Sequence, residues 1–479
     1  MSTIYRPISR RAFVAGTAAA LPGLAIGGLW PSTLEALQRA AADPWVRADA
    51  IVRSVRVPRF SSREFPITAF GAVGDGAAMC TEAIHKAIAA CRAAGGGRVV
   101  VPAGRFLTGA IRLGSGVNLH LTKNATLAFS RDARDYLPVV WTRWEGVEVL
   151  NYSPFIYAFE AENIAITGPG TLDGQAGADA WWNWRGTGPS GGARQTPSRN
   201  RLFEMQAKGI PVADRVFGDG HFLRPNFIQP YRSRNVLIED VTIVNSPMWE
   251  IHPVLCQSVT VRGVTINSHG PNNDGCNPES CRDVLIERCT FDTGDDCIAL
   301  KSGRNDDGRR VNVPVENVVI RDCSMKDGHG GVVIGSEISG GARNVFAERC
   351  RMDSPRLDRA LRLKTNSVRG GTIAGVYMRN VTVGEVAEAV VTIDFFYEEG
   401  DAGKFPPVVR DIDIRNVTSK KSQYAFLLRG YTHAPISDVR VTDCRFDGVE
   451  KPDVLEAVRD LQLANVSING KLFNERVTR

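Results

Sequence analysis

The chain has 479 residues, of which 43% are hydrophobic and 23% charged, and its formal net charge is +6 at pH 7. These proportions supply enough apolar residues for a core and exclude a disordered polyelectrolyte. The small positive excess permits an anionic partner but does not by itself indicate nucleic acid binding. No run of about 18 apolar residues occurs outside the N-terminal segment, so no membrane span is expected in the mature form.

The N-terminal segment is typical of an export signal. The pair Arg10-Arg11 is followed by an apolar stretch that runs to about Trp30, and this order resembles a twin-arginine signal. We therefore expect residues 1–42 to be an export signal, which implies a bacterial protein that is exported already folded. The expected location is periplasmic or secreted.

A short amphipathic helix is predicted next, from Thr81 to Ala94. Its apolar residues recur at helical spacing, and the glycine triplet Gly95-Gly96-Gly97 ends it before a strand begins at Arg98. A helix placed before a long run of strands can cover the open edge of a sheet. We expect residues 65–100 to form such an N-terminal cap.

One nine-residue phrase then recurs almost to the C-terminus, with apolar and polar residues in alternation. An imperfect copy starts at Asn163, and the clear copies start at Asn235, Ser258, Asp283, Asn317, Asn344, Gly375, Asp411, Asp438 and Asp460. Alternation indicates strands with one buried face, and a repeat of this kind predicts a solenoid. The fold class predicted for residues 43–479 is all-β, a single parallel β-helix with one coil per repeat. A β-sandwich is the alternative, but it requires no constant phrase.

The 10 cysteines suggest disulfides in an exported protein. The repeat indicates otherwise for those at its seventh position, where other copies hold valine, so we expect free thiols in the solenoid interior. These are Cys289, Cys323, Cys350 and Cys444. Cys256 and Cys281 share a different position and are expected to stack.

Four polar clusters follow four coils of the repeat. They are Asn272-Asn273-Asp274, Gly294-Asp295-Asp296, Gly328-His329-Gly330 and Arg362-Leu363-Lys364. Asp295 and His329 each lie four residues after the last position of their phrase, so we expect them to stack in register on adjacent coils, about 4.8 Å apart. Any one cluster alone is typical of a turn, but four clusters in register favour an active site.

The expected chemistry of this site is acid–base catalysis. Neighbouring carboxylates disfavour joint ionisation, so one of them should hold a proton at a raised pKa. The site then offers a general acid and a general base, as hydrolysis of a glycosidic bond requires. Arg362 and Lys364, two residues apart on a strand, are expected to face the same way and to hold a substrate carboxylate.

The four clusters, in this order, resemble the four motifs of the polygalacturonases, glycoside hydrolase family 28. The resemblance implies a right-handed parallel β-helix that hydrolyses α-1,4-linked galacturonic acid in pectin with inversion. It implies that Asp295 is the general acid, that Asp274 and Asp296 activate the water, and that His329 tunes the acid. It also implies substrate binding by Arg362, Lys364, Asn272 and Tyr397. The usual first motif is Asn-Thr-Asp, and here Asn273 replaces the threonine.

The stereochemical outcome is not settled by spacing. Coil-to-coil stacking predicts carboxylates about 5 Å apart, which the general rule associates with retention. The family resemblance implies inversion, and three carboxylates leave room for a water between two of them. We therefore expect inversion.

Residues 175–230 interrupt the repeat and contain Trp181, Trp182 and Trp184. Such an insertion can shape a binding face, and its tryptophans either stack on sugar rings or pack the loop down. With Arg215, His221 and Arg224, the insertion is expected to close one end of the cleft and to favour exo action.

Three alternatives remain open at this point. The enzyme could act on rhamnogalacturonan or another pectic glycan. It could be a Ca²⁺-dependent pectate lyase, with the aspartates as ligands, although His329 and the Arg-x-Lys cluster argue against this. It could also be a non-catalytic carbohydrate-binding β-helix, which has no need of stacked carboxylates. The expected partner is a pectic polysaccharide or oligogalacturonide bound by a monomer, without nucleic acid, cofactor or metal.

Overall fold

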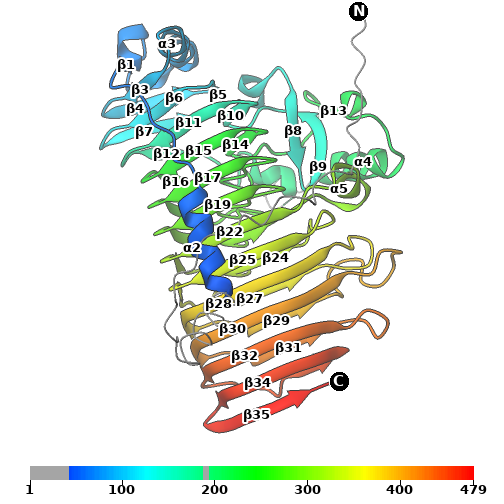
Figure 1. The fold of residues 1–479 in the computed structure, drawn as a ribbon. Helices are drawn as coiled ribbons and strands as arrows, with labels where there is room; N and C mark the ends of the chain where they lie inside the picture. Colours follow the sequence, from blue (N-terminus) through cyan, green and yellow to red (C-terminus); the bar gives the residue numbers. More distant parts are fainter. Residues whose placement is uncertain (1–42, 187–193) are drawn as a thin grey trace, which may run out of the picture. The chain divides into compact units, whose positions relative to one another are not determined.

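A computed structural model describes residues 43–186 and 194–479, so the predicted export signal lies outside the described residues. The larger of the chain's two units spans Arg47–Arg479. None of the described helices is long and apolar enough to cross a membrane. The larger unit is a right-handed parallel β-helix whose coils stack in chain order, from the coil of β1 to the last strand β35 (Figure 1).

Three ladders of parallel strands run along the solenoid. In each of the first two ladders, three strands precede the repeated phrase. From β11 on, the first ladder contains the opening half of each phrase; its strands are β1 (Glu64–Pro66), β3 (Gly97–Val101), β6 (Val117–Leu121), β11 (Glu162–Thr167), β15 (Arg234–Glu239), β17 (Gln257–Arg262), β19 (Arg282–Glu287), β22 (Val315–Arg321) and β25 (Ala342–Glu348). The second contains the closing half: β2 (Asp75–Met79), β4 (Gly104–Thr108), β7 (Ala125–Phe129), β12 (Thr171–Asp173), β16 (Thr242–Val244), β18 (Thr265–Ser268), β20 (Thr290–Thr293), β23 (Ser324–Met325) and β26 (Arg351–Met352). Four longer strands then continue both ladders: β28 (Thr372–Glu385), β30 (Val408–Lys421), β32 (Ile436–Phe446) and β34 (Val458–Ile468).

The third ladder lies outside the repeated phrase. Its strands are β5 (Ile111–Leu113), β10 (Ile156–Phe159), β14 (Ile228–Tyr231), β21 (Ile298–Leu300), β24 (Val332–Gly335), β27 (Arg359–Lys364), β29 (Ala389–Asp394), β31 (Tyr424–Arg429) and β33 (Val454–Glu456). Isolated bridges at Ile251 and Cys276 join β14 to β21, so the ladder is continuous. The loops that lead into this ladder carry the first three polar clusters, and β27 itself carries the fourth, Arg362-Leu363-Lys364.

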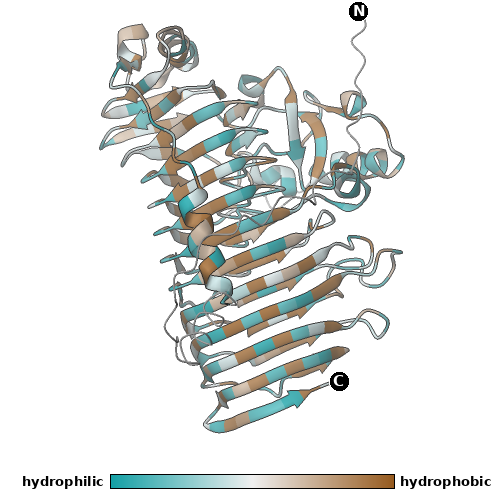
Figure 2. Cartoon of the chain, viewed as in Figure 1, coloured by the Kyte–Doolittle hydropathy of each residue, from teal (hydrophilic) through white to brown (hydrophobic). Residues whose placement is uncertain are grey.

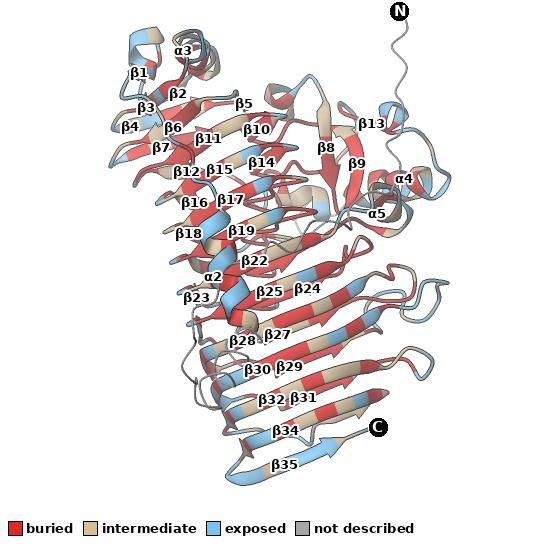
Figure 3. Cartoon of the chain, viewed as in Figure 1, coloured by how far each residue is buried: buried red, intermediate tan, exposed pale blue. Residues whose placement is uncertain are grey.

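The predicted register of the phrase is confirmed. Val236 pairs with Val259, and the pairing continues through Val284, Val318 and Val345 on successive coils. Apolar and polar residues alternate along these strands (Figure 2), because alternate side chains point to the interior and to the outer face. The strands of the stack are largely buried (Figure 3).

The cysteines lie in the core as expected. All 10 are free and buried, and the backbone amide of Cys256 donates a hydrogen bond to the Sγ of Cys281 at 3.4 Å, which confirms that these two stack. Thiols therefore act here as small apolar side chains.

The two ends of the solenoid are covered in different ways. At the first end, α3 (Thr81–Ala93) buries Ala83, Ile84, Ala87, Ile88 and Cys91, the face that the sequence predicted. At the other end, β35 (Lys471–Val477) pairs antiparallel with β34 and is largely exposed (Figure 3). An antiparallel last strand with exposed charges discourages further strand addition.

The segments outside the three ladders are short. The other helices are α2 (Pro44–Ser54), α4 (Gln195–Ala207) and α5 (Asn305–Val311), with 3-10 turns η1 (Ile67–Phe70), η2 (Ala133–Tyr136), η3 (Trp182–Arg185) and η4 (Val212–Asp214). A small sheet joins β8 (Val140–Trp144), β9 (Val147–Asn151) and β13 (Val216–Phe217). It brings the β8–β9 hairpin beside the insertion at residues 175–230.

The first position of the phrase explains its preference for asparagine and aspartate. Asn317 has a φ of 56°, a left-handed conformation that asparagine tolerates better than branched residues. Its amide donates to Asp283 Oδ1 at 2.9 Å and accepts from the Nδ2 of Asn344 at 3.0 Å. A polar ladder thus links successive coils at this left-handed position.

Replacing Asn317 with valine should therefore lower the free energy of unfolding by about 2 kcal/mol, because a branched side chain is strained at positive φ and both hydrogen bonds are lost. Asn317→Gly relieves the strain and should cost about half as much. Urea unfolding followed by circular dichroism measures both values, and equal stabilities of the two variants would contradict the role assigned to the left-handed turn.

Candidate active site

All eight residues predicted from the sequence line one cavity of about 620 Å³. It lies where the loops between the second and third ladders meet the strands of the third ladder. The eight are Asn272, Asp274, Asp295, Asp296, His329, Arg362, Lys364 and Tyr397. Residues more than 100 positions apart in sequence are thus brought to one place.

Register is what gathers these side chains. Cys276 bridges to Ile298, and β21, β24 and β27 then pair in parallel. Asp274 and Asp296 each lie two residues before a bridged position, so they occupy the same level of adjacent coils. The backbone amide of His329 donates to the carbonyl of Asp295 at 3.0 Å, which confirms the predicted stacking of these two residues.

Three carboxylates form the centre of the cavity. One oxygen from each of Asp274, Asp295 and Asp296 lies within 4.8 Å of the others. Asp274 and Asp296 are buried, whereas the side chain of Asp295 is 18% exposed and faces the opening. A substrate entering the cavity therefore meets Asp295 before the other two.

The ionisation of these groups is uneven. Burial and the neighbouring charge of Asp295 raise the pKa of Asp274 well above its usual value, although Lys301 opposes the shift. Burial also raises the pKa of Asp295, but the hydrogen bond and positive charge of His329, with help from two lysines, outweigh it and lower the pKa to about 2. The expected raised pKa thus falls on Asp274, and not on Asp295.

His329 forms a charged pair with Asp295. Its Nδ1 lies 3.0 Å from Asp295 Oδ1, and its side chain is 52% exposed. The hydrogen bond to Asp295 raises the pKa of His329 to about 9, although partial burial acts against this. At neutral pH the pair therefore contains one proton held between a cationic imidazole and a carboxylate.

Arg362 and Lys364 face the same way from β27, as alternation requires. Lys364 Nζ lies 2.7 Å from Asp296 Oδ2, and Arg362 Nη1 lies 3.5 Å from Asp296 Oδ1. The ring of Tyr397 lies beneath both cations, 5.6 Å from Arg362 Cζ and 5.2 Å from Lys364 Nζ. The aromatic face partly compensates for the removal of these charges from water.

The first cluster is anchored from within the protein. Asn273 is fully buried, and its side chain holds its own loop through contacts with Ser268, Gly270, Ser246 and Met248. Replacement of threonine by asparagine therefore alters the loop interior and leaves Asp274 in the cavity. Asn272 accepts a hydrogen bond at 2.7 Å from Arg224, which is fully buried.

The insertion reaches the cavity, but through residues other than those expected. Arg185, Gln195, Thr196 and Arg199 line one side of it. The expectation for Arg215, His221 and Arg224 was wrong: none lines the cavity, and Arg215 is buried in an ion pair with Asp307. Arg224 acts from behind the wall, joining Asn272 to Gln195.

The tryptophans of the insertion pack the loop down. Trp181 is buried within the main core, and Trp182 and Trp184 pack against it. The indole of Trp182 donates to the carbonyl of Ser246 at 2.8 Å. None of the three lines the cavity, so the sugar-stacking alternative is not supported for them.

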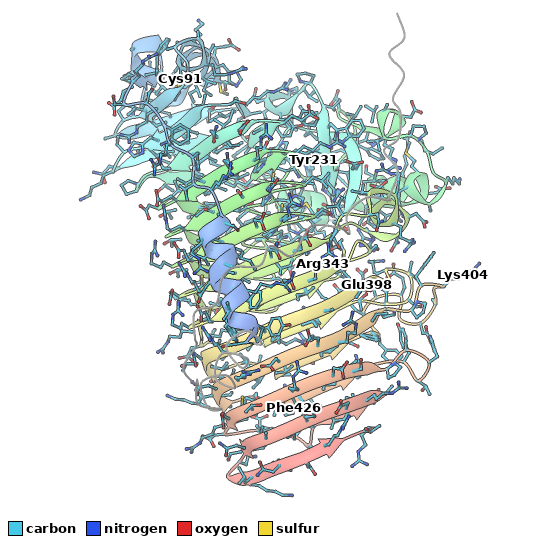
Figure 4. The ribbon with its side chains drawn as sticks, viewed as in Figure 1. Cys91, Tyr231, Arg343, Glu398, Lys404 and Phe426 are labelled. Atoms are coloured by element: carbon cyan, nitrogen blue, oxygen red, sulfur yellow. The ribbon has the colours of Figure 1, made fainter. Side chains whose placement is uncertain are left out.

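Several cavity residues escaped the sequence analysis. Lys301 directly follows β21 and lies 3.5 Å from Asp274 Oδ2 and 3.0 Å from Glu337 Oε2. Glu398, on the loop after β29 (Figure 4), pairs with Arg304 at 3.1 Å. A charge that closes a buried apolar strand, as in Ile298-Ala299-Leu300-Lys301, was the available signal for Lys301.

The cluster is poorly suited to hold a cation. Each buried aspartate already has an ammonium neighbour, Lys301 for Asp274 and Lys364 for Asp296. A divalent ion would have to displace these two positive charges. The arrangement instead suits proton transfer to and from a bound substrate, with adjacent cations for an anionic group.

A solenoid that carries clustered carboxylates, an imidazole and a cationic pair in one cavity defines a glycoside hydrolase of the β-helical class. The model of Glycosyl hydrolases family 28 matches residues 219–464. A probable polygalacturonase of Vitis vinifera is 30% identical over 389 residues, which cover 78% of this chain and 72% of that protein. The chain therefore belongs to glycosyl hydrolases family 28.

Two further relatives bear on the mode of action. The crystal structure of a hyperthermoactive exopolygalacturonase from Thermotoga maritima superposes with a TM-score of 0.87 at 43% identity, covering 91% of this chain and 99% of that one. An exo-poly-alpha-D-galacturonosidase of Dickeya chrysanthemi is 29% identical, and the match covers 74% of this chain and 62% of that protein.

Proposed function

We propose that this protein is a polygalacturonase that hydrolyses α-1,4-linked galacturonic acid in pectin and acts from chain ends. Membership of the hydrolase family makes it a glycoside hydrolase and excludes the lyase and the non-catalytic binding protein. The observation that carries the substrate class is that Arg362 and Lys364 line the same cavity as the three carboxylates and both contact Asp296. Cations beside the acid–base groups suit a sugar that itself bears a carboxylate.

In the proposed mechanism, Asp295 protonates the glycosidic oxygen while Asp274 and Asp296 activate a water on the opposite side of the sugar ring. Asp295 faces the opening, and the His329–Asp295 pair contains a proton to give. His329 supplies that proton, because the carboxyl of Asp295 is itself ionised in the free enzyme. Asp274 acts as a base in its ionised form, which its raised pKa disfavours.

Exo action is supported by the wall at one end of the cavity. Arg199 pairs with Glu145 at 2.7 Å and lies 3.9 Å from Glu398, so three separate segments meet there. A cleft closed at one end admits the end of a polymer but no internal stretch. The 43% identity to the Thermotoga maritima exopolygalacturonase agrees with this mode.

Digestion of long homogalacturonan, followed by chromatography at early times, tests substrate and mode together. We expect short products of constant size from the first minutes, with a slow fall in viscosity. Early products of mixed length would overturn exo action, and release from rhamnogalacturonan alone would overturn the substrate. Proton NMR should show the β-anomer first, since inversion of an α-linkage produces it.

The location and assembly belong to the same proposal. A pectic polymer is met outside the cytoplasm, which agrees with the predicted export signal and with a periplasmic or secreted enzyme. We propose that it acts as a monomer. All of the proposed catalytic and substrate-binding residues come from one chain, and size-exclusion chromatography with light scattering tests the monomer.

A further inference from the structure

We infer that Lys301 is a positioning residue that sets the ionisation of the proposed base Asp274, and that Glu337 competes with Asp274 for its ammonium. The inference rests on the proposed role of Asp274 as a base. It deepens the mechanism by giving a function to a buried cation that lies outside all four sequence clusters.

The surroundings of Lys301 leave its ammonium no freedom to bind substrate. The side chain is 3% exposed. Nζ donates to Glu337 Oε2 at 3.0 Å and to the carbonyl of Gly335 at 3.4 Å, and it lies 3.5 Å from Asp274 Oδ2. Of the three donors of an ammonium, two thus serve hydrogen bonds to protein oxygens, and the charge also pairs with Asp274. The ring of Trp249 lies 4.4 Å away and covers the remaining side.

Each proposed base therefore has its own buried lysine. Lys364 lies beside Asp296 at 2.7 Å, and Lys301 lies beside Asp274 at 3.5 Å. The longer distance arises where the ammonium is shared with a second carboxylate, that of Glu337. Sharing weakens the hold of Lys301 on Asp274, and this leaves Asp274 able to exchange its proton.

The charges that face Asp274 set the direction of the effect. Asp295 and Asp296 disfavour its ionisation, whereas Lys301 and Lys364 favour it. Burial and then the charge of Asp274 raise the pKa of Glu250, which is buried on the preceding coil. A carboxyl cannot supply positive charge, so Glu250 does not favour the ionisation of Asp274. His329 lies beyond Asp295, with which it is paired. Lys301 is thus the nearest cation to Asp274 and the one whose removal matters most.

Glu337 is in turn held by a second cation. It pairs with Arg304 at 3.3 Å, and Arg304 continues to Glu398 at the cavity wall. Burial opposes its ionisation, but Lys301 and Arg304 prevail and lower the pKa of Glu337 well below its usual value. These two cations therefore favour the charged form of Glu337.

The test is the pH profile of kcat/KM on an oligogalacturonide for Lys301→Met and Glu337→Gln. Asp274 must be ionised to act as a base, so its pKa forms the acidic limb. Removing Lys301 should raise that pKa and shift the limb upward by about one pH unit or more. Removing the charge of Glu337 should commit Lys301 to Asp274 and shift the limb downward.

Opposite shifts distinguish this role from a structural one, which would lower kcat and leave both limbs in place. Lys301→Arg should restore the limb towards that of the unaltered enzyme. Lys421→Met, which removes an exposed lysine paired with Glu385, is the matched control and should leave the profile unchanged. If Lys301→Met fails to fold, the downward shift of Glu337→Gln decides alone.

Limbs that stay in place in both active variants, or that move in the same direction, would overturn the inference while leaving the hydrolase itself intact. An unaltered enzyme without activity on any galacturonide would overturn the proposed function instead.

Discussion

Asp295→Asn should lower kcat on polygalacturonate about 10³-fold, because an amide cannot give a proton to the glycosidic oxygen. The change is nearly isosteric, and Asp295 is the partly exposed carboxyl that contacts His329. A 4-nitrophenyl α-galacturonide needs little help from an acid, since its leaving group departs as a stable anion. On that substrate the variant should retain most of the activity of the unaltered enzyme.

Asp274→Asn is the matched comparison for this experiment. If Asp274 is a base, activated leaving groups cannot rescue its loss, and the variant should be slow on both substrates. Rescue of Asp274→Asn with none for Asp295→Asn would exchange the roles of the two residues. This outcome would contradict the assigned roles. The comparison is informative because Asp274 has the raised pKa in the free enzyme, as a general acid would.

Lys364→Met should be the most damaging change among the cations. It leaves the carboxylate of Asp296 buried without its 2.7 Å partner, and loss of one member of a buried pair costs about 3 kcal/mol or more. We also expect a fall in kcat/KM of about 10²-fold, because a base and a substrate contact are disturbed together. Thermal unfolding and steady-state kinetics measure the two effects separately.

The double variant Lys364→Met, Asp296→Asn divides stability from activity. Removing both charges should recover much of the lost stability, because no unpaired carboxylate stays buried, whereas activity should remain low. Lys421→Met breaks an exposed pair and should change stability by less than about 1 kcal/mol. Full recovery of activity in the double variant would sink the assignment of Asp296 to the reaction.

Loss of one ladder contact should destabilise the fold less than loss of one member of a buried ion pair. Asn317 joins coils by hydrogen bonds at the surface of a long stack, and each coil contacts mainly its two neighbours. The buried pairs of the cavity instead connect residues of separate coils through a low-dielectric interior. The ranking of the expected effects follows from this difference.

The sequence alone determined the fold, because in a solenoid the repeated phrase fixes which residues pair on adjacent coils. Val236, Val259 and Val284 occupy one position of the phrase and one rung of the ladder. Each coil contains one copy of the phrase, so residues at the same distance in sequence after the phrase are expected to stack on adjacent coils. Asp295 and His329 both lie four residues after it, and this places them side by side. Interior cysteines follow from the same logic, because they replace valine.

Tertiary structure decided what lies outside the repeat. Residues 175–230 have no periodicity, so nothing in the sequence showed that Arg199 would line the cavity while Arg215 would be buried against Asp307. The sequence predicted one raised pKa among the carboxylates but not which residue would have it. Asp274 and Asp295 belong to similar clusters and burial raises the pKa of both, but the two pKa values move apart because only Asp295 contacts an imidazole. Such energies depend on distance and dielectric, which exist only in the folded chain.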